Sequence, residues 1–154
     1  MPQQYYPPWG FYYKVVFDIG KEEVRFQNVS GLSVEYDMEE YKEGGENRFV
    51  HKLPVRTKYA DLVLKRGMLT DSQVIRWFLD AFRDRQFTPT NISVMLLNEQ
   101  ANKQENPEPL RTWNVVNAVP KKWLVSDFNA TENSVVIETL ELTYNYFTIQ
   151  EKSG

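Results

Sequence analysis

The sequence predicts a mainly β protein (α+β by strict count), built as an antiparallel sheet or barrel of about seven or eight strands that carries one helix. Apolar and polar residues alternate along most of the chain, which is the pattern of strands with one buried face. One segment has helical spacing instead. Aromatic residues, which favour strands, make up 14% of the 154 residues. This length indicates one domain.

The first part of the chain predicts an extended arm followed by three strands. Residues 1–10 are rich in Tyr and Pro and predict the arm, and residues 11–149 predict the domain. Alternation over residues 11–19 predicts the first strand, and the turn residues after it predict a hairpin with residues 24–28. Residues 32–38 alternate in the same way and predict a half-buried strand.

Further strands follow from the same periodicity. They cover residues 62–65, 92–96, 113–119 and 136–146. The last one is predicted as a single long strand whose even-numbered residues share one face. Its odd-numbered residues are more polar and predict the opposite, exposed face.

One helix is predicted over about residues 71–84. Its apolar residues recur at helical spacing as Val74, Ile75, Phe78, Leu79 and Phe82. Thr70 followed by Gln73 matches a capping box, and Asp71 favours the positive end of the helix dipole. The apolar stripe indicates packing against the sheet.

Two polar segments interrupt the strands and predict loops. Residues 39–57 contain Gly44 and Gly45, which give the backbone freedom at positive φ. A loop of this length inside a compact domain is usually functional or disordered. Residues 98–109, with several Asn and Pro, predict a second loop.

The sequence contains no recognisable catalytic, metal-binding or cofactor-binding motif. It has no cysteine, which excludes disulfides, thiolate metal sites and thiol nucleophiles. His51 is its single histidine, so a two-histidine metal site is excluded. Gly44 and Gly45 are not followed by the Gly-Lys-Ser/Thr ending of a phosphate loop. We therefore expect a protein that is not an enzyme, uses no cofactor, and binds partners or assembles.

Charge and hydropathy argue against two further classes. A net charge of -3 does not favour a nucleic-acid binder that relies on a basic face. The N-terminus lacks the cationic start and apolar run of a signal peptide, and no stretch approaches the ~20 apolar residues that span a bilayer. We expect no membrane span and folding in a cytoplasm.

Five segments of the chain occur in a specific order. They are residues 26–35 (FQNVSGLSVE), residues 41–45 (YKEGG) with Leu53-Pro54, residues 59–67 (YADLVLKRG), residues 113–120 (WNVVNAVP), and residues 138–142 (ETLEL) with Phe147. This order resembles the motifs of contractile phage tail tube proteins and of the inner tube proteins of extracellular contractile injection systems. The resemblance covers residues 11–149.

The resemblance implies a fold, an assembly and partners. The family's fold is a small antiparallel β-barrel with one flanking helix, similar to the Hcp tube protein of type VI secretion. Its subunits form hexameric rings that stack into a hollow tube, which sheath contraction drives through a target envelope and which conducts cargo. The implied partners are further copies of the chain, a sheath protein, baseplate and tube-initiator proteins and lumen cargo, with DNA only in a true phage tail. Assembly in a bacterial cytoplasm is implied.

The resemblance also implies two sets of interface residues. Residues 39–57 are expected to contact a neighbouring subunit or ring, through Tyr41, Gly44, Gly45, Arg48, His51, Lys52, Pro54 and Arg56. The polar face of the last predicted strand is expected to line the lumen, through Thr139, Glu141, Thr143 and Asn145. A polar lumen would let cargo slide without sticking.

Two alternative functions stay open at this stage. A tube can begin with a distinct initiator ring on the baseplate, and residues 1–10 are a candidate adaptation to that position. A different class is a monomeric β-sandwich binding module, whose exposed Tyr and Trp side chains bind carbohydrate or peptide. Copy number per particle distinguishes the first alternative, and oligomeric state with a ligand-dependent melting shift distinguishes the second.

Overall fold

The computed structural model describes the domain as ten strands and one α-helix over residues 10–42, 44–45, 50–67, 72–98, 108–126 and 136–151. The expected arm lies outside these residues apart from Gly10. The elements are β1 (Phe11–Phe17), the short 3₁₀ turn η1 (Ile19–Lys21), β2 (Glu22–Phe26), β3 (Asn28–Ser30), β4 (Val34–Tyr41), β5 (His51–Tyr59), β6 (Leu62–Gly67), α1 (Gln73–Arg83), β7 (Thr90–Asn98), β8 (Arg111–Val125), β9 (Ile137–Thr143) and β10 (Tyr146–Glu151).

Eight of the described strands form one continuous sheet, and this sheet is open. Its order is β2-β1-β7-β8-β9-β6-β3, with β10 paired to β8 beside this path. The expectation of a closed barrel is therefore wrong for the described residues. β2 and β3 are the two end strands of this order, and only Gln27 separates them in the chain. They are not hydrogen-bonded to each other as neighbouring strands, so the sheet does not close on itself.

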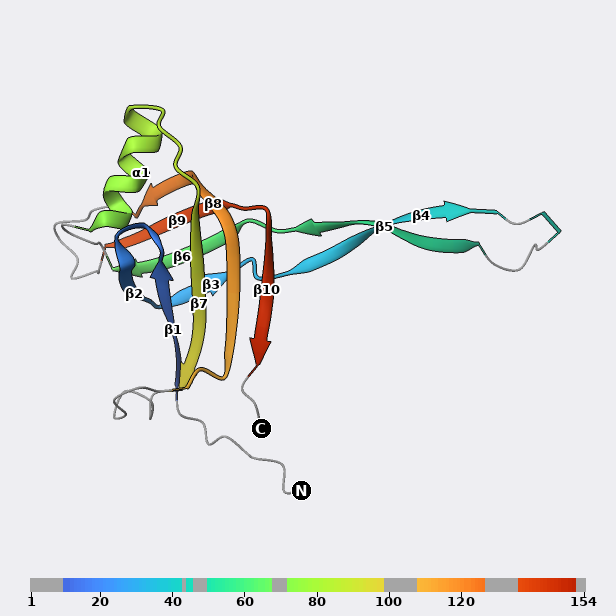
Figure 1. The fold of residues 1–154 in the computed structure, drawn as a ribbon, viewed down its shortest axis with the longest axis horizontal. Coiled ribbons are helices and arrows are strands. Elements are labelled where there is room, and N and C mark those ends of the chain that lie inside the picture. The colour runs from blue at the N-terminus through green and yellow to red at the C-terminus, as the bar shows by residue number, and fades with distance from the viewer. Residues whose placement is uncertain are drawn as a thin grey trace, which may run out of the picture.

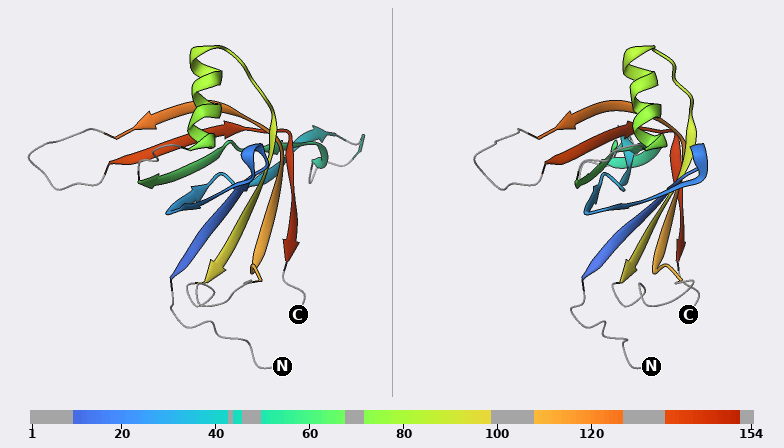
Figure 2. Two further views of the ribbon diagram at one scale, coloured as in Figure 1. Left: turned by 60° about the vertical axis from the view of Figure 1, so that its left-hand side comes forward. Right: turned by 90° about the vertical axis from the view of Figure 1, so that its left-hand side faces the viewer.

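β8 takes part in two differently oriented halves of the sheet. Its first part pairs with β7 and β10, and its last part pairs with β9. Between them Asn117 has φ 55°, and a bulge follows between Pro120 and Lys122. A bulge bends a strand, and it is a place where a ladder tolerates a proline that has no N–H to donate. The strands therefore fan out in two directions (Figure 2).

We name these two halves for use below. The first half-sheet consists of β1, β7, the part of β8 before Asn117, and β10. The second half-sheet consists of the part of β8 after Pro120 together with β9, β6 and β3. In Figure 2 the strands of the first half-sheet run downward, away from α1, and those of the second lie beneath α1.

The predicted strand over residues 136–146 is two strands. β9 has the predicted facing, since its even-numbered side chains are the buried ones. The chain then turns at Asn145, whose N–H donates to the carbonyl oxygen of Val116 at 3.0 Å. In β10 the buried side chain is at an odd-numbered position instead, because Phe147 is buried and Tyr146 is exposed. The turn lets one stretch of chain pair with both parts of β8.

One hydrophobic cluster joins both half-sheets and α1. Near the helix, the ring of Phe17 lies 6.4 Å from that of Phe26 and 6.3 Å from that of Trp77. Its buried members are Val15, Phe17, Val24, Phe26, Leu62, Leu64, Val74, Trp77, Phe78, Ile92, Val94, Trp113, Val115, Ala118, Leu140, Leu142 and Phe147. Most of these side chains are the apolar members of the alternating patterns, which explains why the strands fold onto one another.

The helix α1 begins with a cap that the sequence did not predict. Ser72, rather than Thr70, is the N-cap residue, and its hydroxyl accepts a hydrogen bond from the N–H of Val74 at 3.1 Å. The same hydroxyl donates to the carboxylate of Glu22 at 2.8 Å. Thr70 and Asp71 lie outside the described residues. The start of the helix is therefore tied to β2.

The buried face of α1 differs in part from the predicted stripe. Val74 and Phe78 are buried as predicted, but Trp77 is buried as well and Phe82 is 46% exposed. The indole N–H of Trp77 donates to the carbonyl oxygen of Thr88 at 2.7 Å. The helix therefore turns its tryptophan side toward the sheet, where the large ring fills the core and its N–H still finds a partner.

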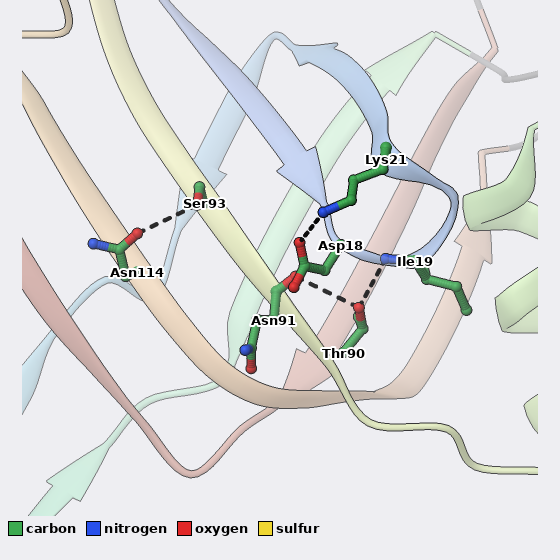
Figure 3. A network of polar contacts seen from close by, with 7 residues as sticks. All are labelled: Asp18, Ile19, Lys21, Thr90, Asn91, Ser93 and Asn114. Atoms are coloured by element: carbon green, nitrogen blue, oxygen red, sulfur yellow. Dashed lines mark hydrogen bonds and ion pairs between the residues drawn. The ribbon is translucent and has the colours of Figure 1, made fainter.

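Hydrogen bonds from the backbone of the turn after β1 attach it to the start of β7 (Figure 3). The hydroxyl of Thr90 accepts from the N–H of Ile19 at 3.0 Å, and the N–H of Asp18 donates to the carbonyl oxygen of Asn91 at 3.0 Å. Lys21 and Asp18 form an ion pair at 3.5 Å within the turn. These contacts fix the end of the first half-sheet that lies nearest α1.

The predicted loop over residues 39–57 is mostly strand. β4 and β5 pair antiparallel, from Val34 opposite Tyr59 to Tyr41 opposite His51, with a bulge after Asp37. They form a separate two-stranded sheet. The first part of β4 lies within the strand predicted over residues 32–38. In the rest of β4 and in β5, polar and charged residues lie at many positions and hide the alternation.

Candidate assembly interface

A two-stranded ribbon, consisting of β4 and β5, projects from the domain (Figure 1). All side chains of β4 are exposed, and those of β5 are exposed except at its two ends. None of the other described strands pairs with it. A hairpin of two strands is marginally stable without a further layer. The ribbon is therefore a candidate surface for a partner.

One side of the ribbon is apolar along the part nearest the domain. The ladder places Val34 opposite Tyr59 and Met38 opposite Pro54, with Tyr36 on the same side between them. Tyr36 is 61% exposed and Met38 is 51% exposed. We call these five residues the apolar face of the ribbon. Tyr59 is half-buried, and the other four are exposed. Clustered exposed apolar side chains mark interaction sites.

The opposite side of the ribbon carries pairs that hold its two strands together. Asp37 lies opposite Arg56, and the Arg56 Nε is 3.8 Å from Asp37 Oδ2. Nearer the tip, the rings of Tyr41 and His51 stack at 5.2 Å between centroids. Cross-strand pairs of opposite charge or of stacked rings each contribute ~0.2–1 kcal/mol. The pairs on this side stabilise the hairpin and leave the apolar face free.

The ribbon leaves the domain at a well-packed root. Gly31 has φ 88°, and a Cβ at this position would collide with the backbone oxygen of Asp61. The hydroxyl of Tyr144 donates to the carbonyl oxygen of Gly31 at 3.4 Å. The ring of Tyr59 packs edge-on against Tyr144 at 5.9 Å and against Phe147 at 5.1 Å. These contacts set the direction in which the ribbon projects.

The hydroxyl at the root is a stable hydrogen-bond donor. Burial raises the pKa of Tyr144 to about 12, and the nearby Asp61 and Tyr59 add to this shift. The phenol therefore keeps its proton across the neutral pH range and can donate to Gly31.

The structure places most of the predicted contact residues on the outer part of the ribbon. Tyr41 and His51 are cross-strand neighbours, and Lys52 follows His51 along β5. Pro54 belongs to the apolar face, whereas Arg56 belongs to the opposite side. The ribbon thus brings these residues together on one projecting element. Their contact with another subunit stays a prediction.

The two predicted glycines lie at the tip of the ribbon. Gly45 has φ 96°, a conformation that other residues rarely adopt, whereas no positive φ constrains Gly44. A Cβ at either position would meet no atom within 4 Å. Arg48 lies outside the described residues.

The sequence prediction missed the apolar face as a contact surface. Val34, Tyr36 and Met38 were correctly predicted to share one side of a strand, but that side was expected to be half-buried within the domain. The ribbon instead exposes them, because β4 pairs only with β5 among the described strands. The available signal for a projecting strand was the set of acidic residues that alternate with these three, because they give β4 a strongly polar opposite side.

The predicted lumen residues lie on or next to β9 in the second half-sheet. Thr139 and Glu141 are on the β9 side that faces away from the core, Thr143 ends that strand, and Asn145 lies in the turn after it. The carboxylate of Glu141 is 4.0 Å from the Lys121 Nζ. The position of these residues relative to a channel stays a prediction.

The first half-sheet has a polar outer side as well. The hydroxyl of Ser93 donates to the side-chain oxygen of Asn114 at 3.3 Å (Figure 3), and Thr148 lies opposite Asn114 in the β8–β10 ladder. Lys14 on this side is 3.1 Å from Glu23 of β2. This side therefore carries hydroxyl, amide and charged groups together with the apolar Val16 and Met95, which the ladder aligns with Ser93 and Lys14.

Neither a cluster of metal-ligating side chains nor a membrane-spanning helix is present in the described residues. They contain no group of three or more His, Cys, Asp or Glu side chains that can hold a metal ion. None of the helices in the described ranges is long and apolar enough to cross a membrane.

Comparison with family models matches residues 9–148 to the T4-like virus tail tube protein gp19. The match spans almost the whole chain. The chain belongs to this tail tube protein family. A comparison with curated protein sequences gives no match.

Solved structures of contractile injection systems resemble this tail tube protein along almost its whole length. A chain in the cryo-EM structure of the anti-feeding prophage (AFP) baseplate is 29% identical, with a TM-score of 0.78, over 97% of both chains. A chain in the extended PVC sheath–tube complex, an extracellular contractile injection system, is 26% identical, with a TM-score of 0.75, over 97% of this chain and 94% of that one.

The tail tube protein also shares its fold with Hcp proteins. Hcp1 from Flavobacterium johnsoniae is 12% identical, with a TM-score of 0.56, over 92% of this chain and 96% of that one. At this identity the likeness concerns the fold alone. The family is one of structural tube proteins, and the chain is a tube protein of a contractile injection system or phage tail.

Proposed function

We propose that this tail tube protein forms hexameric rings that stack into a hollow inner tube, and that the ribbon contacts a neighbouring copy. Sheath contraction drives this tube through a target envelope, and cargo passes along its lumen. The observation that carries the proposal is the exposed apolar face of the ribbon in a chain that belongs to a tube protein family.

The ribbon has the properties expected of a contact between copies. Its apolar face leaves Tyr36 and Met38 largely exposed, and burial of such side chains stabilises an interface by ~25 cal/mol per Å² of apolar area before the costs of association. The packed root at Gly31 and Tyr144 holds the ribbon in one direction, which lowers the entropic cost of binding. A defined direction also suits a repeated contact between identical copies.

The proposed partners follow from the similar particles. One similar chain belongs to a sheath–tube complex, another to a baseplate with 6-fold symmetry, and a third to a tube-terminating cap. By analogy, the tail tube protein is proposed to contact a sheath protein and baseplate or initiator proteins, and to assemble in the bacterial cytoplasm. The proposal also includes cargo that passes through the lumen. DNA is a proposed partner only if the particle is a phage tail.

Negative-stain electron microscopy across a concentration series tests the proposal. Rings and stacked tubes are expected for the unmodified chain, alone or with sheath and baseplate proteins. The double variant Tyr36→Lys/Met38→Lys is expected to stay folded, because both side chains are exposed, and to lose stacked tubes. Phe87→Lys is the matched control, since Phe87 is 57% exposed and lies outside the ribbon.

Each outcome of this experiment decides between named functions. A monomer at every concentration, with sheath and baseplate proteins present, contradicts the tube and favours the monomeric carbohydrate- or peptide-binding module. A double variant that still forms long tubes contradicts the role of the apolar face. The initiator ring is a second candidate, because one similar chain lies in a baseplate. One ring of this protein per particle would assign it to that position.

A further inference from the structure

The link between β5 and β6 holds the root of the ribbon. It consists of Ala60 and Asp61, and β6 continues from it into the second half-sheet (Figure 1). The N–H of Ala60 donates to the carbonyl oxygen of Ser33, just before β4 begins, at 3.4 Å. The backbone oxygen of Asp61 lies against Gly31, where it leaves no room for a Cβ. Both strands of the ribbon therefore meet the domain at this link.

Lys121 reaches the link from the other side of β9. It is the extra residue of the β8 bulge, because Pro120 pairs with Leu142 and Lys122 pairs with the residue before Leu142. A bulge re-aims a side chain. The Nζ of Lys121 donates a hydrogen bond to Asp61 Oδ2 across β9, which lies between β8 and β6 in the sheet. One side chain thus connects the bend of β8 to the root of the ribbon.

The same ammonium group lies between two carboxylates. Its Nζ is 4.0 Å from Glu141 Oε1 and is also bonded to Asp61. The Asp61 and Glu141 side chains are only 29% and 25% exposed, so water and salt screen their repulsion less than at an open surface. The hydrogen bond to Asp61 and the charge of that carboxylate hold the pKa of Lys121 above its ordinary value. Lys121 therefore stays charged at neutral pH and compensates both carboxylates.

A small tilt at the root displaces the outer part of the ribbon by a large distance. β5 has nine residues. At ~3.3 Å per residue it spans about 30 Å, so a tilt of about 10° moves its outer end by about 5 Å, the spacing of neighbouring strands. An exposed ion pair contributes little to the free energy of unfolding. The direction of the ribbon is therefore more sensitive to the Lys121 contact than the stability of the subunit is.

We propose that Lys121 is a positioning residue for the contact between the ribbon and a neighbouring copy, because it holds the link at Asp61 against β9 and so fixes the direction of the ribbon. This inference rests on the tube proposed above and names a residue that controls its assembly. Without the Lys121 charge, the Asp61 and Glu141 carboxylates repel each other across a short distance. The root then moves away from β9, and the ribbon loses the single direction that a repeated contact requires.

Spin-label distances in the unassembled subunit test the positioning role directly. The chain has no cysteine, so Glu39→Cys on the ribbon and Asp80→Cys on α1 carry the only two labels. Double electron–electron resonance is expected to give one narrow distance distribution for this pair. Lys121→Met keeps a long side chain without its charge, and it is expected to broaden the distribution or shift it by about 5 Å. Lys121→Arg keeps the charge and is expected to preserve the narrow distribution.

The assembly of unlabelled variants tests the consequence. Lys121→Met is expected to form rings, but to need at least about tenfold more protein for stacked tubes, because its ribbon is less preorganised. Its urea midpoint is expected to stay unchanged, which a purely structural role would not allow. Lys65→Met is the matched control, since Lys65 is an exposed cation of the same half-sheet, and its tubes are expected at the unmodified concentration.

Charge exchange supplies a rescue. Lys121→Asp puts a third carboxylate beside Asp61 and Glu141, and we expect it to abolish stacked tubes. Adding Asp61→Lys returns one cation to the same group of side chains and is expected to restore stacking. A double variant that stacks no better than Lys121→Asp would overturn the electrostatic basis of the contact.

The outcomes separate this inference from the proposed tube. A Lys121→Met distance distribution as narrow as that of the unmodified chain, and centred at the same distance, overturns the positioning role. A displaced ribbon with tubes at the unmodified concentration overturns the role of Lys121 in stacking and leaves the tube intact. Failure of the unmodified chain to assemble, with sheath and baseplate proteins present, contradicts the tube itself, whereas the distance measurement still decides whether Lys121 fixes the ribbon.

Discussion

The indole N–H of Trp123 on β8 donates a hydrogen bond to Glu138 Oε1 on β9 at 2.6 Å, and Glu138 is 1% exposed. A buried carboxylate is stable only when donors or cations compensate for its lost hydration. Arg66 contributes to this compensation, since Glu138 raises the pKa of its guanidinium against the effect of burial. The pair therefore stabilises the second half-sheet through a polar contact inside an apolar region.

Loss of this donor is expected to destabilise the subunit. Trp123→Phe keeps an aromatic ring but leaves the buried carboxylate with one partner fewer, which costs ~2 kcal/mol of unfolding free energy. Urea denaturation of the unassembled subunit measures this loss. Lys122→Ala, at the exposed neighbouring position, is the control and should change stability by less than ~0.5 kcal/mol. A Trp123→Phe variant as stable as the unmodified chain would show that the bond contributes nothing net.

Gly31→Ala is expected to destabilise the domain and to misdirect the ribbon. Its φ of 88° and the collision of a Cβ with the Asp61 backbone oxygen require local rearrangement. We expect a loss of ~2–4 kcal/mol, within the range for strained backbone substitutions. Gly44→Ala is the matched control, because a Cβ there meets no atom within 4 Å. Thermal unfolding compares the two variants, and equal melting temperatures would contradict the assigned role of Gly31.

Removal of the helix cap is expected to loosen α1 from β2. In Ser72→Ala the N–H of Val74 loses its hydroxyl acceptor, and the Glu22 carboxylate loses its hydroxyl donor. Loss of such a cap costs ~1 kcal/mol. Ser72→Thr keeps a hydroxyl and should restore most of the stability. Hydrogen exchange in α1 reports the effect locally, and unchanged protection in Ser72→Ala would refute it.

Alkaline pH is expected to destabilise the root of the ribbon. Burial raises the pKa of Tyr144 to about 12 from the ordinary tyrosine value of 10.0, so the folded state holds the phenol proton more tightly than the unfolded state. The stability from this group is complete below pH ~10 and is lost as the pH rises toward ~12. Unfolding free energies at several pH values in this window should therefore fall more steeply for the unmodified chain than for Tyr144→Phe. If the unfolding free energies of the two proteins fall in parallel with pH, the titration of Tyr144 does not contribute to stability.

Single cysteines are expected to identify the face that lines the channel. Thr143 and Thr148 lie in different half-sheets, and both are exposed. The side of the first half-sheet that carries Thr148, Ser93 and Asn114 is a second candidate for the lumen, besides the predicted β9 residues. In assembled tubes Thr148→Cys should react with a small maleimide but not with a bulky one, and Thr143→Cys should react with both. The reverse result would return the lumen to β9.

The composition of the core follows from local sequence. Alternation in β1 and β7 puts Val15, Phe17, Ile92 and Val94 on one side, and these residues are buried. The helix was predicted for the same reason, because apolar spacing is a local property, but its cap was not predicted. The five motifs likewise indicated the tail tube family, which the family match confirms.

The arrangement of these elements depends on contacts between distant residues, which periodicity does not encode. Glu22 selects Ser72 as the helix cap from a different strand, and Asn145 turns the last segment against Val116 of β8. Residues 39–57 were predicted as a loop, because the pairing of β5 with β4 depends on which segments lie side by side in space.

The sequence by itself therefore determined the strand-rich class, the core side chains and the family, since these depend on side-chain chemistry at fixed spacing. Only the tertiary structure decided that the sheet of the described strands is open, that β4 and β5 project as a ribbon, and that β10 pairs with β8 alone among the described strands. The physical reason is that strand pairing is a hydrogen-bonded relation between segments far apart in the chain, and its register and limits are set by all the elements packed together.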